Sequence, residues 1–392
     1  MRRRRAAWLL ATAAVVAMIA CEGSEPAGPH PPAAALRFVL LDAGYYHTCG
    51  LAAAGSAWCW GGNAFGTLGD GTLADRTVPA RVAGARSFTS LDAGAGHNCA
   101  VTGSGSAWCW GLNDEGQLGD GTFTLRSSPV AVSGGHAFSR VSAGHAHSCG
   151  LTAQGVAWCW GDDSHGQLGD GGTGLPGKSA QPVRVLFDEP FADIHAGYYQ
   201  TCGMTTHAEV WCWGMNGAGQ NGDGTTIDRH APVAVTGAHQ FTAISPGDRF
   251  VCGVAGGVWC WGLNDDGQVG PTAPDTSRVP LSVEGTAALH VVRASAGAST
   301  VAGTESYACG LRLDGRVFCW GGAIPALRER GAVAPLDDRI RASVVAPGAQ
   351  HVCVLSRDGY AYCGGANFTG QLGDGSRTAR GPLVPVHGPG GT

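Results

Sequence analysis

Charge is scarce in this chain of 392 residues: Asp, Glu, Lys and Arg make up 14% of it, whereas about a quarter is usual in globular domains. The one basic run is Arg2–Arg5, and the rest of the chain holds 21 Lys and Arg against 30 Asp and Glu, a net charge of −9. A basic footprint for nucleic acid is therefore absent. The 65 glycines have no three-residue period, which excludes collagen.

The amino-terminal apolar segment is too short for a comfortable membrane span. Residues 6–20 are apolar and follow the arginines of a positive n-region, as in an export signal. The sequence MIAC, which ends at Cys21, resembles a bacterial lipobox and implies cleavage before Cys21 and lipidation of its thiol. Glu22, directly after this cysteine, resembles the residue that directs a lipoprotein to an outer membrane. We expect residues 1–20 to be a lipoprotein signal peptide; the alternative is an ordinary secretory signal with a chance cysteine.

Residues 21–35 are rich in Pro, Ala and Gly and have no periodic pattern. Such a segment is expected to be a flexible tether between the lipidated Cys21 and a folded domain. Two or three acyl chains would anchor it firmly, because each buried methylene contributes about 0.8 kcal/mol. The protein is thus expected to be exported and held at the outer membrane or cell surface.

Fifteen cysteines are present, and all except Cys21 form local couples. The couples are Cys49 and Cys59, Cys99 and Cys109, Cys149 and Cys159, Cys202 and Cys212, Cys252 and Cys260, Cys309 and Cys319, and Cys353 and Cys363. Six couples are ten residues apart and one is eight apart. In a β-hairpin both spacings place the two cysteines opposite each other, with Gly50 facing Trp58 in the first couple. An export signal and an even number of cysteines favour seven local disulfides, each contributing about 2–3 kcal/mol.

Zinc is the alternative role for these cysteines. His47, His97, His147 and His351 each stand two residues before a cysteine. A zinc site needs four convergent ligands, and one His with two Cys per hairpin is one ligand short; the chain also has no C-x2-C knuckle of this kind. We expect no metal, and we expect each imidazole to fill space and to bond a nearby backbone group.

The cysteine hairpins belong to a longer unit that occurs seven times. Residues 88–132 contain three short apolar strands, FTSLDAG, HNCAV and AWCWG, then a polar Gly/Asp segment and a fourth strand, PVAV, whose proline suits an edge. Successive first cysteines are 50, 50, 53, 50, 57 and 44 residues apart. Repeats of about fifty residues with four strands are typical of β-propellers, whereas the coils of a β-helix are shorter. The repeat predicts an all-β, seven-bladed propeller.

Two tryptophans flank the second cysteine in five of the seven hairpins, as Trp58 and Trp60 do. Residues two apart on a strand share one face, so the cysteine between them lies on the other. Because these indoles recur at equivalent places, we expect them to pack between blades and not to form a binding site. The sixth unit keeps only Trp320 and lacks the GQLGDG segment of the others.

The pattern AGxxHTCGL…WCWGxNxxGQLGDGT…PVxV resembles the RCC1 repeat family, the seven-bladed propellers typified by the regulator of chromosome condensation. The resemblance covers residues 36 to about 388, so that residues 36–392 are expected to form one RCC1-like propeller. It implies guanine nucleotide exchange on a small GTPase as one possible activity. An exported, disulfide-bonded protein would not meet a cytosolic GTPase, however. Exported bacterial members also resemble the propeller inhibitor of β-lactamases that actinomycetes secrete.

The GQLGDG segment and its variants are the first place to look for chemistry. One Asp per loop supplies too few oxygens for calcium, and the loop lacks the lysine of a phosphate-binding P-loop. We expect turns in which the Asp side chains accept local N–H groups; these residues are Asp70, Asp120, Asp170, Asp223 and Asp374. Three residues that break the repeat, His165, His230 and Asp248, have no recognisable catalytic partner. We therefore predict a protein that is not an enzyme and that uses no cofactor.

The positions at which the units differ are the candidates for binding. Two variable residues precede each His position, in turns that should ring the central channel on one face if FTSLDAG is the innermost strand, as the resemblance implies. Tyr and Arg are enriched in interface hot spots. The candidate contact residues are Tyr45, Tyr46, His145, Tyr198, Tyr199, Asp248, Arg249, Gln350 and, in the insertion Thr300–Ser306, Glu305. The alternative is that these residues are ordinary turn decoration.

Together these features predict a monomeric, non-catalytic scaffold on the cell envelope that binds an extracellular or periplasmic protein through one propeller face. Inhibition of an extracellular enzyme is a specific form of this function. Carbohydrate binding is a second alternative, because paired tyrosines can stack on sugars. Nucleotide exchange rests on the family resemblance alone.

Overall fold

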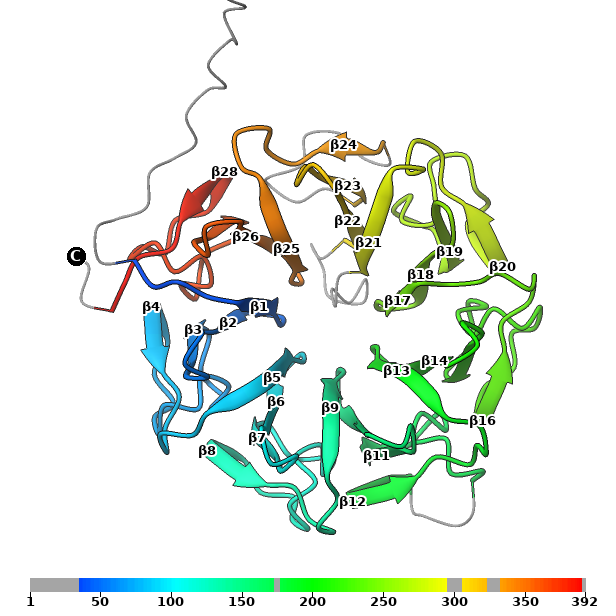
Figure 1. Cartoon of the computed structure of the whole chain (residues 1–392), viewed down its shortest axis with the longest axis horizontal. Helices are drawn as coiled ribbons and strands as arrows, with labels where there is room; N and C mark the ends of the chain where they lie inside the picture. The colour runs from blue at the N-terminus through cyan, green and yellow to red at the C-terminus, as the bar shows by residue number, and fades with distance from the viewer. Residues whose placement is uncertain (1–34, 173–176, 295–304, 323–331, 390–392) are drawn as a thin grey trace, which may run out of the picture.

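Seven four-stranded antiparallel sheets stand around a central axis (Figure 1) in the computed structural model, which describes residues 35–172, 177–294, 305–322 and 332–389. Each sheet uses four consecutive strands, and the blades are numbered 1–7 in chain order. The predicted seven-bladed, all-β propeller is confirmed. The expected signal peptide, the lipidation of Cys21, most of the tether and residues 300–304 of the insertion lie outside the described residues.

The innermost two strands of each blade follow the predicted repeat. The innermost strands, which surround the channel, are β1 (Leu40–Ala43), β5 (Phe88–Ala93), β9 (Phe138–Ala143), β13 (Phe191–Ala196), β17 (Ala243–Pro246), β21 (Leu289–Ala294) and β25 (Ala342–Pro347). The second strands are β2 (His47–Leu51), β6 (His97–Thr102), β10 (His147–Thr152), β14 (Gln200–Thr205), β18 (Phe250–Val254), β22 (Tyr307–Arg312) and β26 (His351–Ser356).

The outer half of each blade contains the cysteine–tryptophan strand and an edge strand. The third strands are β3 (Ala57–Gly61), β7 (Ala107–Gly111), β11 (Ala157–Asp162), β15 (Val210–Gly214), β19 (Val258–Leu263), β23 (Val317–Gly321) and β27 (Ala361–Gly365). The edge strands are β4 (Arg76–Arg81), β8 (Arg126–Ala131), β12 (Lys178–Arg184), β16 (Arg229–Ala234), β20 (Thr276–Ser282), β24 (Ala334–Pro335) and β28 (Arg380–Pro385). Strand β24 has two residues because the sixth unit lost the segment that leads into it. No helix able to cross a membrane is found in the described part of the chain.

The predicted hairpin register is confirmed in every blade. In blade 1, Cys49 pairs with Cys59 and Gly50 with Trp58; the shorter hairpin of blade 5 pairs Cys252 with Cys260. All seven predicted disulfides form, with Cα–Cα distances of 4.0–4.1 Å. Shortening a hairpin by two residues keeps both cysteines on the same face of the sheet, whereas a loss of one would have separated them.

The two tryptophans of a hairpin have different environments. The second one is fully buried between blades, and its indole N–H donates to a carbonyl of the preceding blade, as Trp160 does to Gln117 at 2.9 Å. The first one is half-buried at the edge of the cluster between two blades: Trp158 packs against the cluster of blades 2 and 3, and His136 stacks on it with ring centroids 3.9 Å apart. The predicted packing between blades is confirmed for both indoles, and only the second one is fully enclosed.

The buried histidines connect neighbouring blades through side chains. His97 Nε2 donates to Ser148 Oγ of the next blade at 2.8 Å, and that hydroxyl donates in turn to the carbonyl of Gln117 at 2.8 Å. His147 makes the same contact with Thr201 at 2.9 Å. The expected bond to a backbone group is therefore wrong: the imidazole reaches a polar side chain, which relays the bond to a backbone carbonyl.

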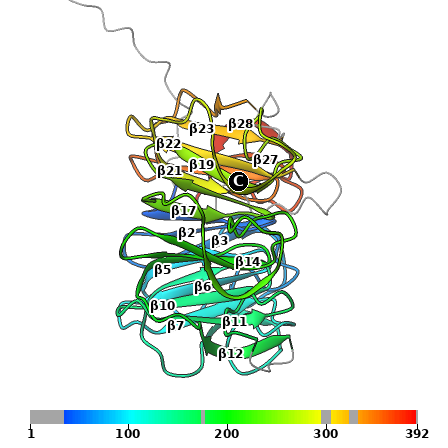
Figure 2. The same cartoon turned by 90° about the vertical axis from the view of Figure 1, so that its right-hand side faces the viewer.

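The ring closes without a shared sheet, because blade 7 consists of the last four strands alone and blade 1 of the first four. The same blade-to-blade contacts close it. His351 lies 2.9 Å from Thr48 Oγ1, and Trp60 donates to the carbonyl of Gln371 at 3.0 Å. The N–H of Phe38 also donates to the carbonyl of Gly359 at 2.8 Å. In the side view of Figure 2 the sheets of successive blades stack on one another around the ring.

The glycine after each innermost strand allows the blades to approach each other at the channel. A Cβ atom added at Gly94 would lie 2.4 Å from the carbonyl oxygen of Gly144, where the neighbour is backbone and cannot move aside. We expect Gly94→Ala to lower the free energy of unfolding by about 3 kcal/mol, the upper end of typical overpacking costs. Gly103→Ala is the control, because its Cβ would meet no atom closer than 3.9 Å. Urea unfolding of both variants measures the effect; equal losses would contradict it.

Candidate binding face

The turns that follow the innermost strands form a ring around one mouth of the channel. The N–H of the first variable residue donates to the carbonyl of the glycine in the next blade: Ala95 to Gly144, His145 to Gly197 and Tyr198 to Gly247, each at 3.1 Å. The carbonyl of the second variable residue accepts the N–H of the residue that follows the third strand or ends it. Tyr46, for example, accepts the N–H of Gly62 at 2.7 Å. In blades 2, 3 and 4 both ends of the turn are thus fixed by backbone hydrogen bonds, and in blade 1 the end at Tyr46 is fixed.

Five predicted contact residues form one aromatic cluster on this face. The ring of His145 stacks on Tyr198 with centroids 4.0 Å apart, and Tyr198 meets Tyr199 edge-on at 4.4 Å. Tyr45 lies 5.8 Å from His145 and 6.0 Å from Tyr46. Blades 1, 3 and 4 therefore contribute aromatic rings to the same place, although these residues are up to about 150 positions apart in the chain.

A cavity of about 820 Å³ opens beside the cluster. Its walls include Tyr45, Tyr46, His145 and Tyr199, all of them predicted. The other walls come from a second row of turns, those between the third strands and the GQLGDG segments. These turns contribute Phe65, Asp114, Glu115, Ser164, His165 and Thr369. This second row was not predicted, and its signal is the pair of variable residues inside the repeated N-x-x-G motif.

The remaining predicted contact residues lie away from this cavity. Asp248 is 1% exposed and lies 3.8 Å from the side chain of Arg249, in the turn of blade 5. Glu305 and Gln350 are half-buried in the turns of blades 6 and 7. The cavity is lined by blades 1–4 and by Thr369 of blade 7, so these four residues share the ring of turns and do not share the cavity.

The other two residues singled out as breaking the repeat, His165 and His230, also have neighbours. His165 Nδ1 lies 2.8 Å from the carboxylate of Asp228, and its ring packs 5.4 Å from that of Tyr199. The side chain of His230 lies beside Gly166, next to His165. Asp228 is thus a partner of His165 that the sequence did not reveal, and the hydrogen bond between them positions the imidazole in the wall of the cavity.

The ionisation of the cluster follows from its burial. Burial, with the neighbouring Tyr198 and the carboxylates of Asp162 and Asp248, raises the pKa of Tyr199 to about 12. Burial lowers the pKa of His145 to about 4, although the carboxylates of Asp162 and Asp114 oppose that change. At neutral pH the phenol is protonated and the imidazole is uncharged. The cluster therefore presents aromatic faces and neutral hydrogen-bonding groups.

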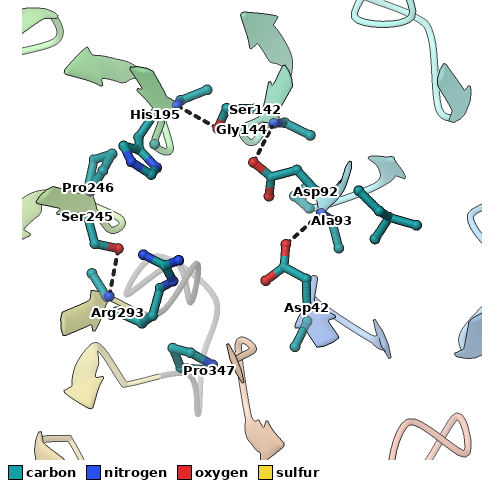
Figure 3. Close-up of a pocket in the computed structure, with 18 of the residues that line it drawn as sticks. Asp42, Asp92, Ala93, Ser142, Gly144, His195, Ser245, Pro246, Arg293 and Pro347 are labelled. Carbon is teal, nitrogen blue, oxygen red and sulfur yellow. Dashed lines mark hydrogen bonds between the residues drawn. The ribbon is translucent and has the colours of Figure 1, made fainter. Parts of the chain in front are cut away.

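A smaller cavity of about 320 Å³ occupies the channel below the cluster, and Tyr45, His145 and Tyr198 line it too. Figure 3 shows Asp42 and Asp92 facing the opening from neighbouring blades, with His195 and Arg293 across from them. These polar residues of the innermost strands were not predicted as a group. They occur at one repeated position, directly before the residue that ends the strand.

The polar channel residues tie one blade to the next. Asp42 accepts the N–H of Ala93 at 2.8 Å, and Ser142 accepts that of Ala196 at 3.0 Å (Figure 3). Burial and the nearby carboxylate of Asp92 raise the pKa of Asp42 well above its usual value. The channel side chains are therefore engaged in holding the innermost strands together.

The GQLGDG segments are turns, as predicted. Asp120 accepts the N–H of Thr122 at 2.9 Å and forms an ion pair with Arg126 at 2.9 Å. The amide of Asn113 donates to the carbonyls of Thr122 and Thr124 inside the same loop. Among the described residues, no group of three or more His, Cys, Asp or Glu side chains is placed to hold a metal ion.

Solved structures with the same architecture are numerous. Human WBSCR16 superposes with a TM-score of 0.74 at 22% identity, over 84% of this chain and 93% of that chain. Prp20p of Saccharomyces cerevisiae superposes with a TM-score of 0.67 at 18% identity, over 80% of this chain and 81% of its own. Yeast RCC1 (Prp20) bound to Kap60 gives a TM-score of 0.70 at 18% identity, over 98% and 90%. At these identities the likeness shows the fold alone.

The sequence also shows which family the protein belongs to. A family model described as the RCC1-like domain matches residues 19–324, which is more than three quarters of the chain and covers five blades and the first three strands of the sixth. The seven blades, the cysteine hairpins and the GQLGDG turns all lie in the positions that the repeat predicted. The protein is therefore a member of the RCC1-like domain family.

Proposed function

We propose that the protein is a non-catalytic scaffold that binds a partner protein through the aromatic cavity and its rim. The observation that carries this proposal is the convergence of tyrosines on one face, beside large apolar side chains that are open to solvent. Phe65 in the cavity wall is 49% exposed, and Phe368, whose ring packs 5.6 Å from Tyr46, is 51% exposed. Exposed apolar groups next to tyrosines are typical of protein interfaces.

The fixed geometry of the face also supports binding. The turns of blades 3 and 4 are held at both ends by backbone hydrogen bonds, and that of blade 1 is held at Tyr46. All three turns stand on disulfide-linked hairpins. A surface that is already rigid loses little conformational entropy when a partner binds. The partner therefore meets a preformed cavity.

An extracytoplasmic location on the cell envelope, with Cys21 as the lipid anchor, is part of the proposal. Seven disulfides support it, because such bonds persist in oxidising compartments and are rare in the cytosol. Relatives support a protein partner: two of the similar structures are named for binding to Gsp1p and histones and to Kap60. Gsp1p, histones and Kap60 are partners of those relatives and are not assigned to this protein.

Affinity capture from the envelope and secreted proteins of the host tests the proposal. We expect the processed, oxidised protein to retain a specific protein. A Tyr46→Ala, Tyr199→Ala double variant should bind that protein at least about thirtyfold more weakly, since two interface tyrosines together typically contribute more than about 2 kcal/mol. Tyr360→Ala is the matched control. Tyr360 lies in the turn between β26 and β27, away from the ring of turns that carries the cluster, and its ring contacts Arg37. Equal retention by all three proteins would contradict the proposed face.

Carbohydrate binding is the second candidate, favoured by the tyrosine rings that line the cavity. A glycan array with the same double variant separates the two: sugar binding that depends on Tyr46 and Tyr199, with no captured protein, would replace the protein partner. An enzyme among the captured proteins, inhibited by the bound propeller, would identify the inhibitor form of the proposed function.

A further inference from the structure

The wall of the large cavity is negatively charged. Four acidic side chains from three different blades line it, together with the ammonium group of Lys178 and the imidazole of His165. The imidazole is hydrogen-bonded to Asp228. The acidic residues are Asp75, Asp114, Glu115 and Asp162. Lys178 pairs with Glu115 at 3.2 Å, and Asp75 pairs with Arg377 at 3.1 Å. Asp114 and Asp162 are not in these pairs, and they leave the cavity with an excess of negative charge.

Asp162 is the deepest of these carboxylates, with 7% of the residue exposed. Its hydrogen bonds come from neutral donors: the N–H and hydroxyl of Ser164 at 3.0 Å and the amide of Gln167 at 2.6 Å. Asp114 accepts the amide of Gln117 at 3.2 Å. Neutral donors orient a carboxylate without cancelling its charge. Both groups therefore keep an attraction for a cation: Asp162 is buried in the wall, and Asp114 is exposed to solvent at the edge of the cavity.

Aromatic faces lie in the same wall. Tyr46, Phe65 and Tyr199 line the cavity together with the carboxylates, and a cation is attracted to the face of such a ring. The imidazole of His145 is uncharged at neutral pH and so does not repel a cation. Its buried Nδ1 atom has no hydrogen-bond partner among the described residues.

We propose that the cavity receives a positively charged side chain, an arginine or a lysine, that the partner protein projects into it between the tyrosine rings and the carboxylates of Asp114 and Asp162. This inference rests on the proposed protein-binding function and adds the chemistry of the group that is recognised. A planar guanidinium can stack on one of the rings while its N–H groups donate to a carboxylate. The charge complementarity favours this occupant over a neutral sugar or an acidic peptide segment.

A pair of small probes tests the inference without the partner. Nα-acetyl-arginine methylamide and the citrulline analogue have nearly the same shape and differ in charge. Calorimetric or NMR titration of the whole processed protein should give saturable binding of the arginine probe with a Kd on the order of 1 mM, and binding of the citrulline probe at least tenfold weaker. Equal binding of the two probes, or saturable binding of neither, would overturn the inference.

Variants locate the effect. Asp114→Asn keeps an oxygen that can accept the amide of Gln117 and removes one negative charge. We expect this variant to bind the arginine probe about threefold to tenfold more weakly. The double variant Asp114→Asn, Asp162→Asn should bind the arginine and citrulline probes equally. Asp358→Asn, an exposed acid in a turn between the second and third strands, is the control for net charge and should change nothing. If Asp358→Asn weakens binding of the arginine probe as much as Asp114→Asn does, the probe responds to the net charge of the protein, and the cavity is not its binding site.

The two proposals can fail separately. An arginine preference that depends on Asp114 and Asp162 would stand even if affinity capture found no protein partner. A captured partner that is lost with Tyr46 and Tyr199 would stand even if the two probes bound equally.

Discussion

Acidification is expected to destabilise the folded protein steeply, by about 4 kcal/mol per pH unit near pH 5. The cause is a set of buried imidazoles. Burial lowers the pKa of His47 and His145 to about 4 and that of His97, His147 and His351 to about 3. Unfolding restores ordinary values near 6.5. Between these limits the unfolded chain binds protons that the folded chain does not bind, so stability falls as the pH falls.

Two carboxyl groups act in the opposite direction. Burial raises the pKa of Asp163 to about 6, and burial with the charge of Asp92 raises that of Asp42. Near pH 5 Asp163 holds a proton in the folded protein that it loses on unfolding, because the unfolded pKa is near 4. The raised pKa of Asp42 acts in the same direction and accounts for at most one further proton. About five protons taken up by histidines, less these, leave a net uptake of at least about three, which gives the stated slope.

The measurement is the free energy of urea unfolding from pH 7 to pH 4.5 with the disulfides intact. His147→Gln is the informative variant, since Gln200 occupies the same position in blade 4 and donates to the carbonyl of Gly247 at 3.2 Å. This variant should take up one proton fewer on unfolding, which lowers the slope of the unfolding free energy against pH by about 1.4 kcal/mol per pH unit. A stability that is flat between pH 6.5 and pH 5, or a slope that His147→Gln leaves unchanged, would refute this account.

Removing one buried indole is expected to be the most damaging single truncation. Trp160→Ala should lower the free energy of unfolding by about 4 kcal/mol, in the range of large core truncations. The indole is fully buried, packs 5.8 Å from the ring of Phe138 and donates to the carbonyl of Gln117. The loss would open a gap between blades 3 and 2.

Trp158→Ala in the same hairpin is the matched control. This indole is half-buried at the edge of the cluster between blades 2 and 3 and stacks on His136, so its loss should cost less, about 1 kcal/mol. Urea unfolding of both variants at neutral pH gives the comparison. Equal losses would mean that the two indoles contribute alike and that burial between blades is not what stabilises the ring.

The local features of this protein were predictable because they depend on residues close together in the chain. The spacing of Cys49 and Cys59 determines their register in a two-stranded hairpin, and the same reasoning held for the shorter hairpin of Cys252 and Cys260. The turn role of Asp120 follows from its neighbours Thr122 and Arg126. Recurrence of such hairpins at fifty-residue intervals was sufficient to predict the number of blades.

The candidate face was predicted in part. Tyr45, Tyr46, Tyr198 and Tyr199 stand out as variable residues in turns of one ring, and the structure brings them together with His145. The second row of turns, with Phe65, Asp114 and His165, belongs to a different segment of the repeat. Its approach to the first row depends on how each blade twists and leans on the next, which the spacing of residues does not reveal.

By itself, then, the sequence determined the blade: strand order, hairpin register, disulfides and turns follow from contacts within about fifty residues. The tertiary structure decided what lies between blades. Histidines and serines relay hydrogen bonds across the gaps, and the ring closes through side chains of Thr48 and His351 with no shared strand. Tyrosines and carboxylates of separate blades meet in one cavity. These contacts join residues from about 30 to more than 300 positions apart, and only the curvature of the closed ring sets which of them can touch.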